Sequence, residues 1–183
     1  MSYKWWIIIA IALFAIGLAL GLTTPPGTNG LLSENIAALE ELAALLASLP
    51  QFAVFLIIFI KNAFTLLFCF TLSPFFCLVP ILALIVNGWL LAEVSVVVIQ
   101  ENSLSFLLAG LLPHGILELP AFFLGQAAAL SFGTTVILAV FRKESRSLLL
   151  PNLKQNLKYL SVAVALLLPA AIIETYITPL LLT

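Results

Sequence analysis

Long apolar runs, separated by short polar or turn-rich stretches, dominate the pattern of this chain. A helix needs about 20 mostly apolar residues to cross a bilayer. Five runs are about this long, and they predict spans at residues 5–23, 52–72, 75–98, 114–141 and 159–181. We therefore expect an all-α, polytopic transmembrane helical bundle of about five spans, with residues 1–183 forming a single integral membrane domain.

Two further segments predict helices that do not cross the membrane. Residues 103–112 are apolar, but they cover only about half a crossing, and Pro113 cannot donate the hydrogen bond that would continue the helix. They predict a re-entrant half-helix with a break at Pro113 and Gly115, and Pro120 can bend the helix that follows. In residues 33–49 leucines fall on one side and glutamates on another, a pattern typical of an amphipathic interfacial helix or of a cap over the bundle.

Composition and charge agree with a membrane protein. Hydrophobic residues make up 63% of the chain, charged residues 8%, and the mean hydropathy is +1.25, which indicates the lipid bilayer as the main surroundings. The net charge of −1 leaves no basic surface for nucleic acid. Because basic loops stay inside, the five lysines and arginines of residues 142–158 predict a cytoplasmic loop. The N-terminus is then cytoplasmic and the C-terminus extracytoplasmic.

Polar side chains inside the apolar runs are the candidate functional residues, because polar groups at membrane depth are costly and need partners. His114 and Glu118 are four residues apart, which stacks them one turn apart on the same helical face. Lys61 is expected either to pair with Glu93 or Glu118 or to extend toward the membrane surface. The predicted buried polar cluster consists of His114, Glu118, Glu174, Asn62, Asn87 and Lys61.

Small residues at intervals of four follow this pair along the same helix. Such ridges let neighbouring helices approach closely. The ridge predicts that the helix lies at the centre of the bundle, where other spans bring Asn62, Asn87 and Glu174 to Glu118. Its members are Ala121, Gly125, Ala129 and Gly133.

The polar cluster is open to three interpretations. His114, Glu118 and Glu174 could hold zinc or another divalent metal with one position left for water. Buried carboxylates beside a histidine could instead relay protons or ions. In the third interpretation the polar groups only satisfy one another, and the protein works through its surface as a scaffold or subunit. With one histidine the chain has no two-histidine metal motif.

Residues 113–121 carry a family resemblance. Pro113-His-Gly-Ile-Leu-Glu-Leu-Pro-Ala121 resembles the PHGxxExPA motif of the stage II sporulation protein M family, which comprises bacterial and archaeal integral membrane proteins. Asn62, Asn87-Gly88, and Glu174 followed by Thr178-Pro179 agree with it. The chain departs from the family at Lys61-Asn62, where paired asparagines are frequent, and at Ser73-Pro74, where glycines are.

The resemblance implies a function as well as a fold. The family's named member belongs to a complex that remodels septal peptidoglycan, and a role in anchoring cell-wall hydrolases is ascribed to it; it is not known as an enzyme. The resemblance therefore implies a non-enzymatic scaffold or subunit of a membrane or cell-envelope assembly, with other membrane or envelope proteins, or further copies of itself, as partners. The alternative is a transporter, a channel or an intramembrane metal-dependent enzyme that uses the His/Glu cluster.

Overall fold

The computed structural model of the chain describes residues 2–23 and 48–182, and every regular element in these ranges is helical. Five helical segments are long and apolar enough to cross a membrane. The first four are single helices: α1 (Tyr3–Thr23), α3 (Gln51–Leu72), α4 (Leu78–Glu101) and α5 (Leu104–Phe141). The fifth joins η1 (Lys143–Leu148), α6 (Leu149–Ile172), η2 (Ile173–Ile177) and α7 (Thr178–Leu181). The prediction of an all-α, multi-pass membrane protein is confirmed.

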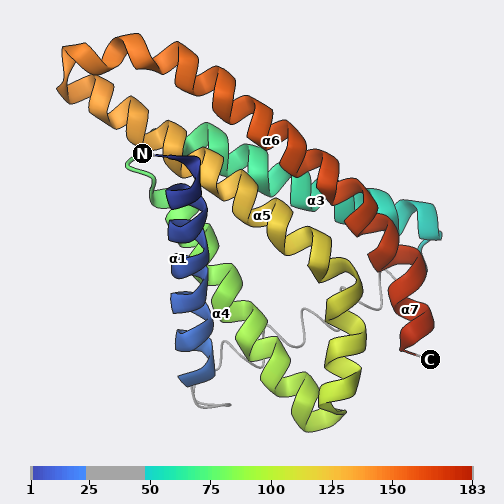
Figure 1. The fold of residues 1–183 in the computed structure, drawn as a ribbon. Helices are drawn as coiled ribbons and strands as arrows, with labels where there is room; N and C mark the ends of the chain where they lie inside the picture. The colour runs from blue at the N-terminus through green and yellow to red at the C-terminus, as the bar shows by residue number, and fades with distance from the viewer. Residues whose placement is uncertain (1, 24–47, 183) are drawn as a thin grey trace.

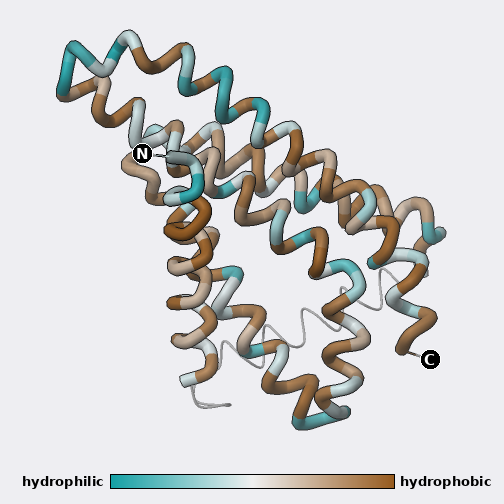
Figure 2. The backbone as a smooth tube through the Cα atoms, in the orientation of Figure 1, coloured by the Kyte–Doolittle hydropathy of each residue, from teal (hydrophilic) through white to brown (hydrophobic). Residues whose placement is uncertain are grey.

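Helix α5 is the centre of the bundle and contacts each of the other spanning helices. Half of its most apolar stretch is buried inside the protein, compared with 17–33% for the other four segments. Figure 1 shows α5 and α6 as a long hairpin, with α3 beside it and α1 packed along α4. In Figure 2 the hydrophilic colour gathers at the α5–α6 turn and at the α4–α5 corner. The apolar helix surfaces between these polar ends are consistent with a lipid environment.

The ridge of small residues on α5 lies in the core. Ala121 and Ala129 are fully buried. A Cβ atom on Gly125 would meet the side chain of Leu66 on α3, and one on Gly133 would meet the backbone of Ser73. The predicted close approach along this ridge is confirmed.

A second small-residue contact joins α1 to α4. A Cβ atom on Gly17 would collide with the backbone of Ile85, and one on Gly88 would collide with the backbone of Phe14. The two backbones therefore touch without side chains between them, as in other membrane helix pairs that use small residues. The sequence contains a signal for this contact, because Gly17 and Gly21 are four residues apart and lie on one helical face. This pair was not used in the prediction.

The predicted helix break at Pro113 is wrong. Helix α5 runs from Leu104 through Pro113 and Pro120 to Phe141, so residues 103–112 are not a separate half-helix. A proline inside a helix removes one hydrogen bond and crowds the preceding turn, and here it leaves the helix continuous. Figure 1 shows that α5 bends sharply in its first half, the usual response to an internal proline. A re-entrant path for this segment stays a prediction.

Other helix bounds differ in smaller ways from those predicted. Helix α4 begins at Leu78 rather than at residue 75, because Phe76 and Cys77 adopt a φ of 54° in a tight turn. That turn is closed by the Cys77 amide, which donates to the Ser73 carbonyl at 3.0 Å. Helix α6 begins at Leu149, well before the predicted residue 159. The interfacial helix predicted for residues 33–49 lies almost entirely outside the described residues.

Candidate functional site

His114 and Glu118 form the part of the candidate site that α5 contributes. Their positions one helical turn apart bring His114 Nε2 to 3.9 Å from Glu118 Oε2. The side chain of His114 is 14% exposed and that of Glu118 is 30% exposed. Gly115 between them is buried, while Pro120 is exposed. The pair thus faces the bundle interior but stays accessible from one side.

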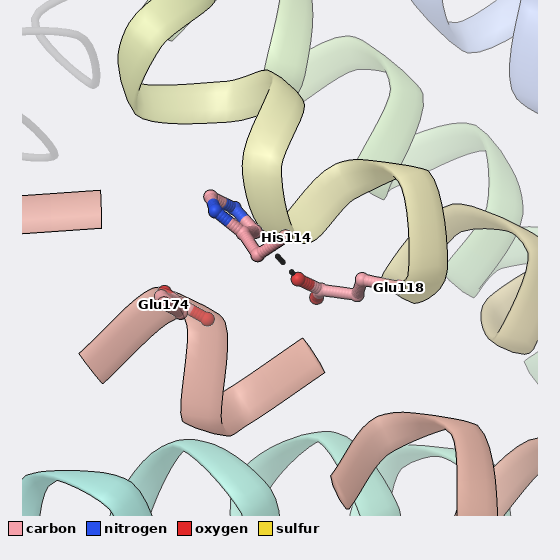
Figure 3. A group of neighbouring side chains, drawn as sticks. All are labelled: His114, Glu118 and Glu174. Carbon is pink, nitrogen blue, oxygen red and sulfur yellow. Dashed lines mark ion pairs between the residues drawn. The ribbon is translucent and has the colours of Figure 1, made fainter. Parts of the chain in front are cut away.

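Glu174 comes to this pair from η2, a wider π-helical turn at the end of α6. Pro169 lies inside α6 one turn earlier, and Thr178 Oγ1 donates to the Ile173 carbonyl at 3.3 Å across the wide turn. Turns of this kind are rare and occur often at functional sites. One nitrogen of His114 and one carboxylate oxygen each from Glu118 and Glu174 lie within 4.8 Å of one another (Figure 3).

Asn62 connects this trio to α3. Its Nδ2 donates a hydrogen bond to Glu118 Oε1 at 3.0 Å. Glu118 Oε2 remains on the side of His114. One carboxylate oxygen is therefore held by an amide while the other faces the imidazole.

The trio borders a pocket of about 660 Å³ that lies between α1, α3, α4, α5 and the end of the last segment. Phe14, Leu66 and Leu167 are among its apolar lining residues. Its polar lining consists of Lys61, Asn62, Thr65, Asn87, His114, Glu118 and Glu174. All six residues of the sequence-predicted polar cluster therefore lie on this one pocket.

Lys61 and Asn87 lie on the pocket but are not tied into the trio. Both are exposed, and within residues 2–23 and 48–182 Asn87 Nδ2 donates only to the Ala83 carbonyl of its own helix, at 2.7 Å. Among the described residues Lys61 forms no ion pair, either with Glu118 or with Glu93. Glu93 is buried on α4 and does not line the pocket. The pairing expected for Lys61 is therefore not formed.

A second polar cluster, between α5 and α6, was missed by the sequence reasoning. Asn156 Nδ2 donates to Asn152 Oδ1 at 2.8 Å and to Ser131 Oγ at 3.3 Å. The sequence signal was present, since two asparagines four residues apart share a helical face. A loop is predicted for residues 142–158, whereas both asparagines lie in the first turns of α6, which begins at Leu149.

The trio has the chemistry of a cation or proton site. Imidazole nitrogen and carboxylate oxygen are both ligands for divalent metals. Two carboxylates this close inside a membrane also repel each other unless a proton or cation lies between them. Nothing in the geometry by itself selects a covalent reaction.

Comparison with known proteins places the chain in a family. The sequence profile described as "Stage II sporulation protein M" matches residues 8–179. The chain belongs to the stage II sporulation protein M family. The family motif of this chain, Pro113–Ala121, lies on the central helix α5. Three residues of the motif, His114, Gly115 and Glu118, line the pocket.

The family match is accompanied by one relative of no described function. An uncharacterized protein of Methanocaldococcus jannaschii is 32% identical over 100 residues, which cover 52% of this chain and 54% of that protein. The chain thus spans about half the length of this relative. No solved structure matches.

Proposed function

We propose that this member of the stage II sporulation protein M family is a non-enzymatic membrane subunit that holds partner proteins of a membrane or cell-envelope assembly. The observation that supports it is the exposure of Lys61 and Asn87 on the pocket wall. Lys61 lies near the middle of α3 and Asn87 near the middle of α4. Polar groups at this depth need partners, and a partner helix that carries a polar or acidic side chain would supply them.

The surroundings of the pocket fit a partner that is itself a membrane helix. Exposed apolar side chains flank both polar residues, among them Ile60 and Phe64 on α3 and Val86 on α4. A partner helix with an apolar body and one polar group would match this arrangement, because hydrogen bonds between membrane helices favour association. The partner is another membrane or envelope protein, or a second copy of this chain, in line with the anchoring role that the family resemblance implies.

The same proposal includes an orientation. The five basic residues between Arg142 and Lys158 face the cytoplasm, as basic segments beside membrane spans generally do. The N-terminus is then cytoplasmic and the C-terminus extracytoplasmic. Labelling with a membrane-impermeant thiol reagent tests this orientation. Cysteines placed in η1 should stay unlabelled in intact cells and react after the cells are broken, and labelling in intact cells would contradict the orientation.

Site-specific photo-cross-linking in native membranes tests the partner. Photoreactive residues at Thr65 and Leu90 line the pocket, while matched positions at Leu67 on α3 and Leu82 on α4 are exposed but do not line it. We expect a discrete protein adduct from the two pocket positions, weakened by Lys61→Ala and Asn87→Ala, and mainly lipid adducts from the two controls. Equal labelling at all four positions would contradict the proposal.

Liposome flux measurements test the alternative of transport. A transporter or channel built on this pocket would carry protons or ions through Glu118. We expect proton leak across liposomes to be the same with the wild-type protein and with Glu118→Gln. A flux that Glu118→Gln abolishes would replace the scaffold proposal with a transport function.

A further inference from the structure

In the described part of the chain neither Glu118 nor Glu174 forms an ion pair with a lysine or an arginine. The two carboxylates and the His114 imidazole come within 4.8 Å of one another on segments that cross the membrane. Of the described residues that line the pocket, Lys61 is the one cationic side chain besides His114, and it forms no ion pair with either glutamate. Coulomb repulsion between carboxylates is strong where water is scarce, so two glutamates in this position need either a proton or a cation between them.

We propose that His114, Glu118 and Glu174 bind one divalent transition-metal cation at the edge of the pocket. This inference does not depend on the scaffold proposal, because a metal that links α5 to η2 could stabilise the bundle whether or not a partner binds. One nitrogen and two carboxylate oxygens form a three-residue ligand set of the kind that holds zinc and leaves one position open. Manganese and iron take similar mixtures of imidazole and carboxylate.

The distances allow a metal with small movements of side chains. Two ligand atoms bonded to one zinc ion at about 2.0–2.2 Å lie roughly 3–4 Å apart. The trio within 4.8 Å, with 3.9 Å between His114 Nε2 and Glu118 Oε2, is close to that spacing. Each glutamate side chain has rotatable bonds that can close the remaining gap.

The hydrogen bonds around Glu118 and His114 are also compatible with metal binding. Asn62 Nδ2 binds Glu118 Oε1 at 3.0 Å, which leaves Oε2 toward His114. Hydrogen bonds of this kind orient metal-binding carboxylates. His114 Nδ1 is buried and has no hydrogen-bond partner among the described residues. No hydrogen bond from Nδ1 therefore fixes the orientation of the imidazole, so the ring can turn toward a metal, and the pocket leaves room for water at the open position.

Metal binding is tested on the full chain, purified in nanodiscs, stripped with a chelator and offered Zn²⁺ or Mn²⁺. We expect about one ion per chain by elemental analysis. His114→Ala, Glu118→Gln and Glu174→Gln should each weaken binding by more than about 100-fold, and Asn62→Leu by about 10- to 100-fold. Glu93→Gln, a buried acid outside the pocket, and Glu144→Gln in η1 should bind as the wild type does.

Protection of His114 from diethyl pyrocarbonate is a second test that needs no variant. The chain has one histidine, so mass spectrometry of the peptide that carries it reports on the site alone. Zn²⁺ at about 100 times its dissociation constant should slow modification roughly 100-fold, because only about 1% of sites stay free. An unchanged rate would overturn the proposal. So would wild-type protein that retains neither ion, or binding that survives all three ligand substitutions or is lost equally in Glu93→Gln.

Discussion

Asn62 on α3 donates a hydrogen bond from its Nδ2 to Glu118 Oε1 on α5 at 3.0 Å. The bond ties a flanking span to the central helix at the edge of the pocket, next to His114. Its two residues lie 56 positions apart in the chain. It therefore links the packing of the bundle to the position of the carboxylate in the candidate site.

Replacing Asn62 with leucine should destabilise the bundle. The change leaves a half-buried carboxylate without its amide donor, which costs about 1–2 kcal/mol. Unfolding of the chain by a denaturing detergent in mixed micelles measures the difference. Thr71→Val on the same helix is the control, because in the described part of the chain Thr71 Oγ1 donates only to the Leu67 carbonyl of its own helix. Equal losses of stability in the two variants would argue against a role for the Asn62–Glu118 bond.

Replacing Gly88 with alanine should separate α1 from α4. The new Cβ atom would collide with the backbone of Phe14, which cannot rotate away as a side chain can. Forcing extra atoms into a packed contact costs about 1–3 kcal/mol. The same unfolding measurement, or cross-linking of cysteines placed on α1 and α4, reports the loss.

Gly110→Ala is the matched control for this change. A Cβ atom there meets only the side chain of Leu182, at 3.8 Å, and alanine favours a helix by about 1 kcal/mol over glycine. Gly110→Ala should therefore be neutral or stabilising. If Gly88→Ala behaves in the same way, the close approach of α1 and α4 is not as tight as described.

Replacing Asn156 with alanine should weaken the pairing of α5 with α6. Asn156 is 1% exposed, and its side chain bonds to Asn152 and Ser131. Loss of these bonds and of the buried volume should cost about 1–3 kcal/mol. Thermal unfolding in micelles measures this cost, and Gln155→Ala at the exposed neighbouring position should change stability by less than about 0.5 kcal/mol.

The thiol of Cys77, in the turn before α4, should react slowly with iodoacetamide and only at high pH. Burial raises the pKa of this thiol above its usual value, although a hydrogen bond with Thr134 opposes part of the shift. Because the thiolate is the reactive form, a raised pKa means less thiolate at pH 8 than a free cysteine has.

The rate of Cys77 alkylation as a function of pH checks this prediction in a Cys69→Ala background. Ser147→Cys, at an exposed position of η1, is the reference thiol. Cys77 should lag behind the reference at pH 8, and its rate should continue to rise at pH values where the reference rate has levelled off. Matching pH profiles would show that the turn does not bury Cys77.

The sequence by itself determined the class of the protein and most of its spans. Crossing a bilayer demands a minimum length of apolar residues whatever the fold, so α1 and α3 lie within two residues of their predicted bounds at each end. Helical periodicity is also local, and it placed His114 beside Glu118 and put Gly125 and Gly133 on a packed face.

Only the tertiary structure decided how these parts meet. Whether Pro113 ends a helix or bends it depends on the packing around α5, because the loss of one hydrogen bond allows either outcome. The approach of Glu174 requires the π-helical turn η2 and the docking of α6 on α5. Lys61 lacks the partner expected for it because neither Glu93 nor Glu118 comes within ion-pair distance. These relationships join residues that are far apart in the chain, and a periodic pattern carries no information about such distances.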